Sequence, residues 1–251
     1  MAELSAKTTD QATSKAIHDL GSAFMLHKET MARAADNGYE NPFTFYFAGR
    51  GGVLGDVDAD VVYSAFGWFA PTVVRPMWDA GVAVHGARQA ASRYFAACAE
   101  WGRDHLEGVK SLDRFADLAE RVTGAAETSG RPLFAGWSRE PRVADGPGRA
   151  MQLVHVMREW RGANHLVATT AEGLSPLEAV LTDHPDQARF FGWPEPFPEV
   201  TDELRQRHDE AEALTDRLCA PAFEMLSASE RSEFADIVPA MFAAGTSGPH
   251  G

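Results

Sequence analysis

The sequence predicts a mainly α-helical protein built from two halves of similar plan, with a long helical segment at the C-terminal end. Apolar residues recur at helical spacing along most of the 251 residues. Residues 164–184 contain no lysine or arginine and have the form of two short helices joined at Gly173. The first half repeats this plan of helix, glycine-containing turn and proline-led helix in VVYSAFGWFAPTVVRPMW. We therefore expect two winged-helix-like halves packed together.

The first half, residues 15–127, begins with a helix that Asn37 and Gly38 end. A proline-led aromatic stretch and a glycine-rich passage follow, and an aspartate then caps the next helix. Ala-rich and amphipathic patterns predict the remaining helices of this half. Helices are expected over residues 15–35, from Asp56 or Asp58 to Gly67, and over 71–79, 85–101 and 112–126.

Residues 128–148 hold three prolines among several glycines, which predicts a linker between the halves. The second half, residues 149–245, starts with a helix that we expect to end near Trp160. In the next motif, Ser175 is a favourable N-cap, Pro176 suits the first helical position and Glu178 completes a capping box. Long helices beginning near Thr201 and at Ser227 or Ser229 then form the C-terminal segment.

The charge of the chain argues against nucleic acid as a partner. The formal net charge is −13, whereas phosphate binding requires lysine and arginine. The second of the two short helices joined at Gly173 offers only Glu178, Thr182, Asp183 and His184. A DNA-binding helix carries cations or amides at such positions. The chain has no membrane-length apolar segment and no leader-like N-terminus, so we expect a cytoplasmic protein without a membrane partner.

Several segments resemble known proteins. The run VTDELRQRHDEAEALTDRLCAPAFEMLSASERSEFADIV is similar to the dimer-forming end of MarR-type winged-helix regulators. YFAGRGGVLGDV, FAP, GRPL, REWRGANH and TDRL together resemble an actinobacterial helix-turn-helix-like family of poorly characterised proteins, some encoded beside natural-product genes. The resemblance implies a homodimer. The proline-rich passage 190–200 is short where such proteins carry a further helix and a wing, which predicts a truncated wing.

Candidate catalytic residues gather in the sequence HVMREWRGANH, residues 155–165. A histidine beside a carboxylate gives an oriented acid or base, and an arginine can hold an anion through two hydrogen bonds. We therefore assign His165 as proton carrier, Arg161 as anion clamp and Glu159 as orienting group, with His27 as a further candidate. The alternative interpretation is a structural network of Glu159 with neighbouring arginines at the end of a helix.

Candidate ligand-binding residues come from an aromatic cluster that borders the glycine-rich passage. Apolar side chains with a few polar groups are typical of pockets for small organic molecules. The same cluster could equally belong to the core. The expected ligand contacts are Tyr46, Arg50, Tyr63, Phe66, Trp68, Phe69 and His155.

These patterns favour a protein that binds a small, partly apolar organic molecule between its halves, either sequestering it or converting it by acid and base chemistry. The first alternative is a MarR-like, ligand-responsive regulator. The second is a metal- or haem-dependent enzyme on a helical scaffold. The sequence identifies no cofactor, and it assigns no metal ligand because its histidines lack the usual His-x-x-x-His or Glu-x-x-His spacing.

Overall fold

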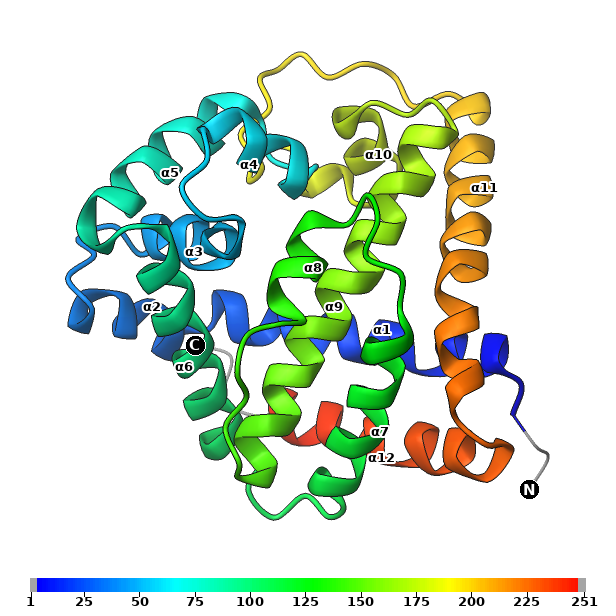
Figure 1. The fold of residues 1–251 in the computed structure, drawn as a ribbon. Coiled ribbons are helices and arrows are strands. Elements are labelled where there is room, and N and C mark those ends of the chain that lie inside the picture. The colour runs from blue at the N-terminus through cyan, green and yellow to red at the C-terminus, as the bar shows by residue number, and fades with distance from the viewer. Residues whose placement is uncertain (1–3, 248–251) are drawn as a thin grey trace.

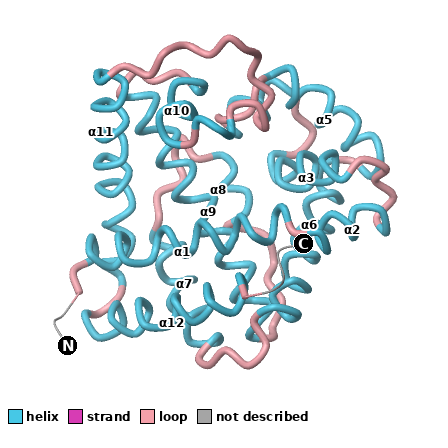
Figure 2. The backbone as a smooth tube through the Cα atoms, turned by 180° about the vertical axis from the view of Figure 1, so that it is seen from behind, coloured by secondary structure: helices cyan, strands magenta, loops and turns pink. Residues whose placement is uncertain are grey.

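The computed structural model describes residues 4–247, which contain helices and loops but no β-strand (Figures 1 and 2). The α-helices are α1 (Ala6–Leu26), α2 (Lys28–Asp36), α3 (Pro42–Gly51), α4 (Ala59–Phe66), α5 (Pro71–His85), α6 (Ala87–His105), α7 (Leu112–Ala125), α8 (Pro132–Trp137), α9 (Gly146–Ala171), α10 (Pro176–Asp183), α11 (Asp202–Cys219) and α12 (Ala228–Thr246). Short 3-10 helices are η1 (Gly52–Leu54), η2 (Pro185–Gln187) and η3 (Ala220–Met225). The mainly helical prediction is confirmed, whereas the described residues contain no β-hairpin wing in either half.

Helix α9 is the centre of the fold, and α1, α6, α7, α8 and α11 pack around it (Figure 1). It starts where the Asp145 side chain accepts a hydrogen bond from the Gly148 amide, with Pro147 in the first turn. Its residues from Ala150 to Met157 are all buried, as expected of a helix that is covered on every side. Each neighbouring helix is therefore positioned by its contact with α9.

The N-terminal region differs from the prediction in its helix boundaries. Helix α1 already begins at Ala6, capped by Ser5, and it ends at Leu26. His27 has extended backbone angles and acts as the N-cap of α2, so the single predicted helix over 15–35 is two helices. The aromatic stretch after Asn41 is also helical, because the Asn41 side chain caps α3.

The segment predicted as a linker contributes to the core. Helix α8 lies within residues 128–148, and its Leu133, Phe134 and Trp137 are buried. The largest hydrophobic cluster contains these residues together with side chains from both sides of the segment. Helix α9 also continues past Trp160, near which we expected it to end, and it includes Gly162. The division into two domains stays a prediction.

The two helices predicted on either side of Gly173 are the end of α9 and the short helix α10, which form a helix-turn-helix. Gly173 has a φ of 73°, a left-handed conformation that glycine adopts without steric cost, and it turns the chain between the helices. The capping box of Ser175 and Glu178 is formed as predicted. A small cluster of Ala168, Leu174, Ala179 and Ala211 joins this unit to α11.

The C-terminal helices also begin where the sequence predicts. Thr201 caps α11, and Ser227 forms a capping box with Glu230 at the start of α12. Helix α11 packs on α9, while α12 packs on α1. These faces are buried within one chain, and the expected homodimer stays a prediction. No helix in residues 4–247 is long and apolar enough to span a membrane.

Candidate functional site

A cavity of about 450 Å³ opens between helices α1, α3, α9 and α10. Trp68 and Phe69, which connect α4 to α5, and the segment after α10 complete its wall. Lining residues are Lys15, His18, Asp19, Ser22, Met25, Leu26, Phe43, Tyr46, Arg50, Trp68, Phe69, Arg158, Gly162, His165, Ala179, Val180, Asp183, His184, Gln187, Phe190 and Phe191. They come from both parts of the chain that the predicted linker separates. Five of the predicted site residues are among them: Tyr46, Arg50, Trp68, Phe69 and His165.

One side of the cavity is aromatic. The Phe69 ring lies edge-on to Phe191, with 4.7 Å between ring centroids, and Phe190 contacts both Phe43 and Phe69. The passage expected to be a truncated wing supplies this wall. Its Phe191 carbonyl accepts a hydrogen bond from the Ala70 amide at 2.8 Å, which fixes the segment over the Trp68–Phe69 turn.

The floor is a buried ion pair. The Arg50 guanidinium donates to both carboxylate oxygens of Glu159, through Nε at 2.8 Å and Nη2 at 2.9 Å, and its Nη1 donates to the Tyr46 hydroxyl at 3.0 Å. Burial raises the pKa of Glu159, but the charges and hydrogen bonds of Arg50 and Arg158 outweigh it and lower that pKa to about 2. The carboxylate is therefore ionised and already paired.

Arg158 gives this floor an excess of positive charge. Its Nε donates to the Ser22 hydroxyl and its Nη1 to Glu159, both at 3.3 Å, and its side chain is 16% exposed. Two guanidinium groups thus face one carboxylate. The close approach of α1 depends on Gly21, because a Cβ atom there would lie 2.6 Å from Cδ of Arg158.

His18 and acidic residues surround the cationic floor. Loss of water around the His18 ring lowers its pKa, and the charge of Arg158 lowers it further. Lys15 pairs with Asp19 at 2.5 Å, so their charges cancel at the cavity wall. Arg158 shares its carboxylate, Glu159, with Arg50, and Asp183 adds an exposed acidic group to the lining.

His165 lines the cavity from α9, next to Trp68, with 5.4 Å between ring centroids. Its Nδ1 is 3.2 Å from the Thr215 hydroxyl oxygen and 3.3 Å from Oε1 of Glu212. Burial lowers the pKa of His165 despite the opposing effect of the Glu212 charge. The carboxylate beside His165 is thus Glu212 from α11, whereas we expected Glu159.

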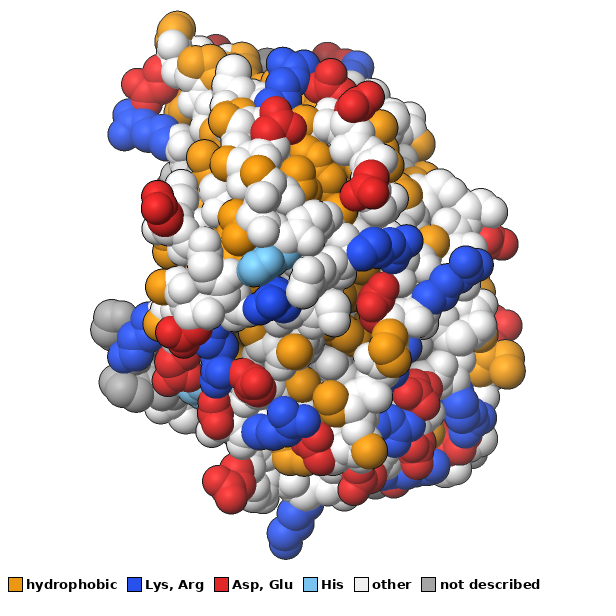
Figure 3. Space-filling view, turned by 60° about the vertical axis from the view of Figure 1, so that its left-hand side comes forward, with side chains coloured by type: hydrophobic (Ala, Val, Ile, Leu, Met, Phe, Trp, Pro, Cys, Tyr) orange, Lys and Arg blue, Asp and Glu red, His pale blue; other side chains and the backbone are white. Residues whose placement is uncertain are grey.

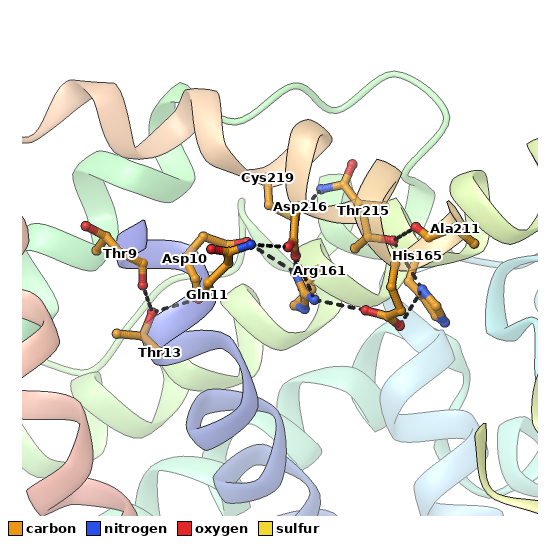
Figure 4. Close-up of polar contacts among 12 residues, drawn as sticks. Thr9, Asp10, Gln11, Thr13, Arg161, His165, Ala211, Thr215, Asp216 and Cys219 are labelled. Carbon is orange, nitrogen blue, oxygen red and sulfur yellow. Dashed lines mark hydrogen bonds and ion pairs between the residues drawn. The ribbon is translucent and has the colours of Figure 1, made fainter. Parts of the chain in front are cut away.

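Arg161 is directed away from the cavity. Figure 4 shows its guanidinium between Asp10 of α1 and Asp216 of α11. The guanidinium lies 3.2 Å from Asp10, 3.2 Å from Asp216 and 3.3 Å from Glu212. Burial raises the pKa of Asp10 to about 7, with Asp216 and Glu212 adding to the shift that Arg161 opposes. The expected anion clamp is therefore already surrounded by negative charge.

The other predicted residues lie outside the cavity. His155 is fully buried in an aromatic cage, 4.6 Å from the Trp137 ring centroid, and burial lowers its pKa to about 3. His27 caps α2 near His105 and Glu29. Tyr63 packs against the main hydrophobic core. Phe66 supports the floor from below, since the Arg50 guanidinium carbon lies 4.3 Å above its ring centroid.

Sequence reasoning missed the contribution of α1. Lys15, His18, Ser22 and Met25 follow helical spacing, and all of them line the cavity. This stripe resembles a solvated helix face, because the apolar residues Ile17, Leu20 and Phe24 mark the opposite, buried side. The helical spacing of His18, Ser22 and Met25 among charged residues was the only signal in the sequence for a role of this face in the cavity.

The surface around α10 carries little positive charge. Glu178 lies in its first turn, and Asp183 and Asp186 are exposed at its end. On the face drawn in Figure 3, acidic side chains are interspersed with the basic ones. A phosphate backbone at the turn motif would therefore meet carboxylates.

Comparison with known proteins identifies the class of the chain. A family model described as a helix-turn-helix family matches residues 10–247, and the chain belongs to this family. No curated protein and no solved structure matches it. Membership covers nearly the whole described fold, so the family is defined by more than the turn motif itself.

Proposed function

We propose that this member of the helix-turn-helix family binds a small, partly apolar organic anion in the cavity between α1, α3, α9 and α10. The observation that carries the proposal is the pairing of an aromatic wall with a floor in which Arg50 and Arg158 face the single carboxylate of Glu159. The anionic group of the guest is held by Arg158 and the Tyr46 hydroxyl, and its apolar part lies against Phe69 and Phe190.

The size and lining of the cavity support this assignment. Its volume of about 450 Å³ lies within the range of sites for drug-sized molecules, roughly 300–1,000 Å³. Charge-assisted hydrogen bonds in a partly buried site orient a carboxylate or sulfonate strongly. The aromatic rings add apolar contact area without demanding one particular ring system.

The geometry supports binding better than turnover. Of the proposed catalytic residues, only His165 lines the cavity, because Arg161 and His27 lie elsewhere and Glu159 is paired with Arg50. A regulator of the MarR kind would need cations on α10, where acidic side chains lie instead. We therefore propose ligand binding, without a nucleic acid partner, as the function.

A matched pair of fluorescent probes tests the proposal. Anilinonaphthalene sulfonate (ANS) carries a sulfonate, and phenylnaphthylamine (NPN) has the same aromatic system without it. We expect the native protein to bind ANS at one site per chain more tightly than NPN, because only ANS engages Arg158. Equal affinities, or binding only after partial unfolding, would overturn the proposal.

Gly162 offers a way to fill the cavity. It lies inside α9 on the cavity wall, and a Cβ atom there would meet nothing within 4 Å. Gly162→Leu should therefore fold and weaken binding of both probes. Gly124→Leu is the matched control, because Gly124 is an exposed, equally open position in α7. If both variants bind the probes like the native protein, the guest does not occupy this cavity.

A further inference from the structure

A second site is formed where α9 and α11 pack together. His165 comes from α9, while His208 and Glu212 lie four residues apart on α11 and so share one face of that helix. One ring nitrogen from each histidine and one carboxylate oxygen of Glu212 all lie within 4.8 Å of one another. We propose that His165, His208 and Glu212 bind a divalent transition-metal ion of the zinc type.

The donor set defines the class of ion. Two imidazole nitrogens and one carboxylate suit zinc and its first-row neighbours, whereas calcium and magnesium prefer oxygen ligands alone. In a tetrahedral zinc site, with bonds of about 2.0–2.1 Å, ligand atoms lie about 3.4 Å apart. Nδ1 of His165 and Oε1 of Glu212 are already 3.3 Å apart. The other ligand atoms of the cluster lie within 4.8 Å, so the His208 side chain has to move closer to complete the site.

His208 provides an independent reason to expect a ligand. The residue is only 8% exposed, and its Nε2 is buried without a hydrogen-bond partner among the described residues. A buried polar atom without a partner costs free energy, and such atoms are rare in native proteins. An ion bound through Nε2 of His208 would remove this cost.

The surroundings hold the ligands and favour positive charge. Arg161 contacts Oε2 of Glu212, which leaves Oε1 directed at His165. Asp10 and Asp216 lie around the same guanidinium, so carboxylates outnumber cations here. Outer groups that hold the metal ligands in position, as Arg161 holds Glu212, are typical of metal sites.

A second histidine cluster provides the comparison within the same protein. His27, Glu29 and His105 also lie within 4.8 Å of one another, but all three are only partly buried. His105 already pairs with Glu29 at 2.9 Å and stacks on Trp101. No ring nitrogen of this second cluster is both buried and without a hydrogen-bond partner in residues 4–247, so we assign the ion to the α9–α11 cluster.

Calorimetric titration of untagged, chelator-treated protein with zinc chloride tests the inference, with no organic ligand present. We expect saturable zinc binding that His208→Gln and Glu212→Gln each weaken by about tenfold or more. Glu212 is partly exposed, so its variant keeps the test valid even if the His208 variant unfolds. His105→Gln is the matched control and should retain binding at the α9–α11 cluster.

The substitution of cobalt for zinc supplies a second readout, because its visible absorption reports ligation by nitrogen and oxygen. The expected band should disappear in Glu212→Gln and persist in His105→Gln. No saturable zinc binding, or binding that only His105→Gln removes, would overturn the inference. Since no probe of the cavity is used, failure here leaves the proposed anion-binding function standing.

Discussion

The ion pairs of Arg50 and Arg161 both involve helix α9, but they differ in the balance of charge. Arg50 meets a single carboxylate, Glu159, and Arg158 adds a second guanidinium beside it. Arg161 meets three carboxylates from α1 and α11. The first region therefore holds an excess of cations and the second an excess of carboxylates, although Arg158 and Arg161 are less than one helical turn apart in the sequence.

This difference shows that helical phase and the neighbouring helix decide what an arginine can do. Arg158 points toward α1 at Gly21 and reaches the cavity. Arg161 is rotated toward α11, where acidic residues take up its hydrogen-bond donors. The same side chain thus lines a cavity in one position and crosslinks helices in the other.

Removing Arg50 should produce the largest effect. Arg50→Met leaves the ionised Glu159, whose side chain is 1% exposed, without its two main hydrogen bonds. Breaking a buried pair in this way costs about 3–5 kcal/mol, measured as the free energy of unfolding in urea at pH 7. The control is Arg75→Met, whose exposed pair with Asp60 should contribute less than about 1 kcal/mol. Equal losses in both variants would contradict the account.

The same pair predicts the behaviour of the native protein in acid. The pKa of Glu159 is lowered from 4.5 to about 2 in the folded state. Its contribution to stability is therefore present above pH 4.5 and is lost as the pH falls toward 2. Unfolding curves across this range should show less acid sensitivity in Arg50→Met than in the native protein.

Asp10→Asn tests the excess of carboxylates around Arg161. Because the pKa of Asp10 is raised from 3.8 to about 7, its contribution to folding is most favourable below pH 3.8 and is lost as the pH rises through 7. The variant should exceed the native protein in stability at pH 8 by up to a few kcal/mol. This gain should shrink toward pH 4. Asp60→Asn, at an exposed site, is the control. A loss of stability at both pH values in Asp10→Asn would refute the prediction.

Arg158→Met tests the cationic floor itself. A hydrogen bond to a charged group contributes about 1.5–3 kcal/mol. Its loss should therefore weaken ANS binding by roughly 10- to 100-fold. NPN has no anionic group, so its affinity should change by less than about twofold. Fluorescence titrations with the two probes provide the measurement. A parallel loss of both affinities would indicate a damaged cavity instead of a lost anion contact.

The smallest effect should come from Arg161→Met. This arginine does not line the cavity between α1, α3, α9 and α10, and its charge is offset by Asp10, Glu212 and Asp216. ANS affinity should therefore stay within about twofold of the native value in the same titration. A loss of ANS affinity similar to that in Arg158→Met would contradict the assignment of the anionic group to Arg158.

Local sequence signals predicted the helix boundaries well where capping residues mark them. Ser175, Thr201 and Ser227 each begin a helix as expected, because their side chains satisfy the first free amides. His27 and Gly162 misled the prediction in opposite directions. A histidine served as an unexpected cap, and packing kept a glycine inside the long helix α9 despite its low helix propensity.

The site was predicted only in part, because residues distant in sequence determine which carboxylate lies beside each arginine or histidine. The aromatic cluster near Tyr46 does border a cavity, since apolar side chains close in sequence stay close in space. Nothing local showed that Glu159 pairs with Arg50, or that Glu212 lies beside His165. His155 shows the same limit, because its spacing on α9 is equally compatible with a core position.

A crystal structure of the protein with bound ANS tests the central claim most directly. The account predicts that the sulfonate lies within hydrogen-bond distance of Arg158 and the Tyr46 hydroxyl, with the aromatic rings against Phe69 and Phe190. A sulfonate directed to solvent or bound at Arg161 would contradict the assignment of this cavity to an organic anion.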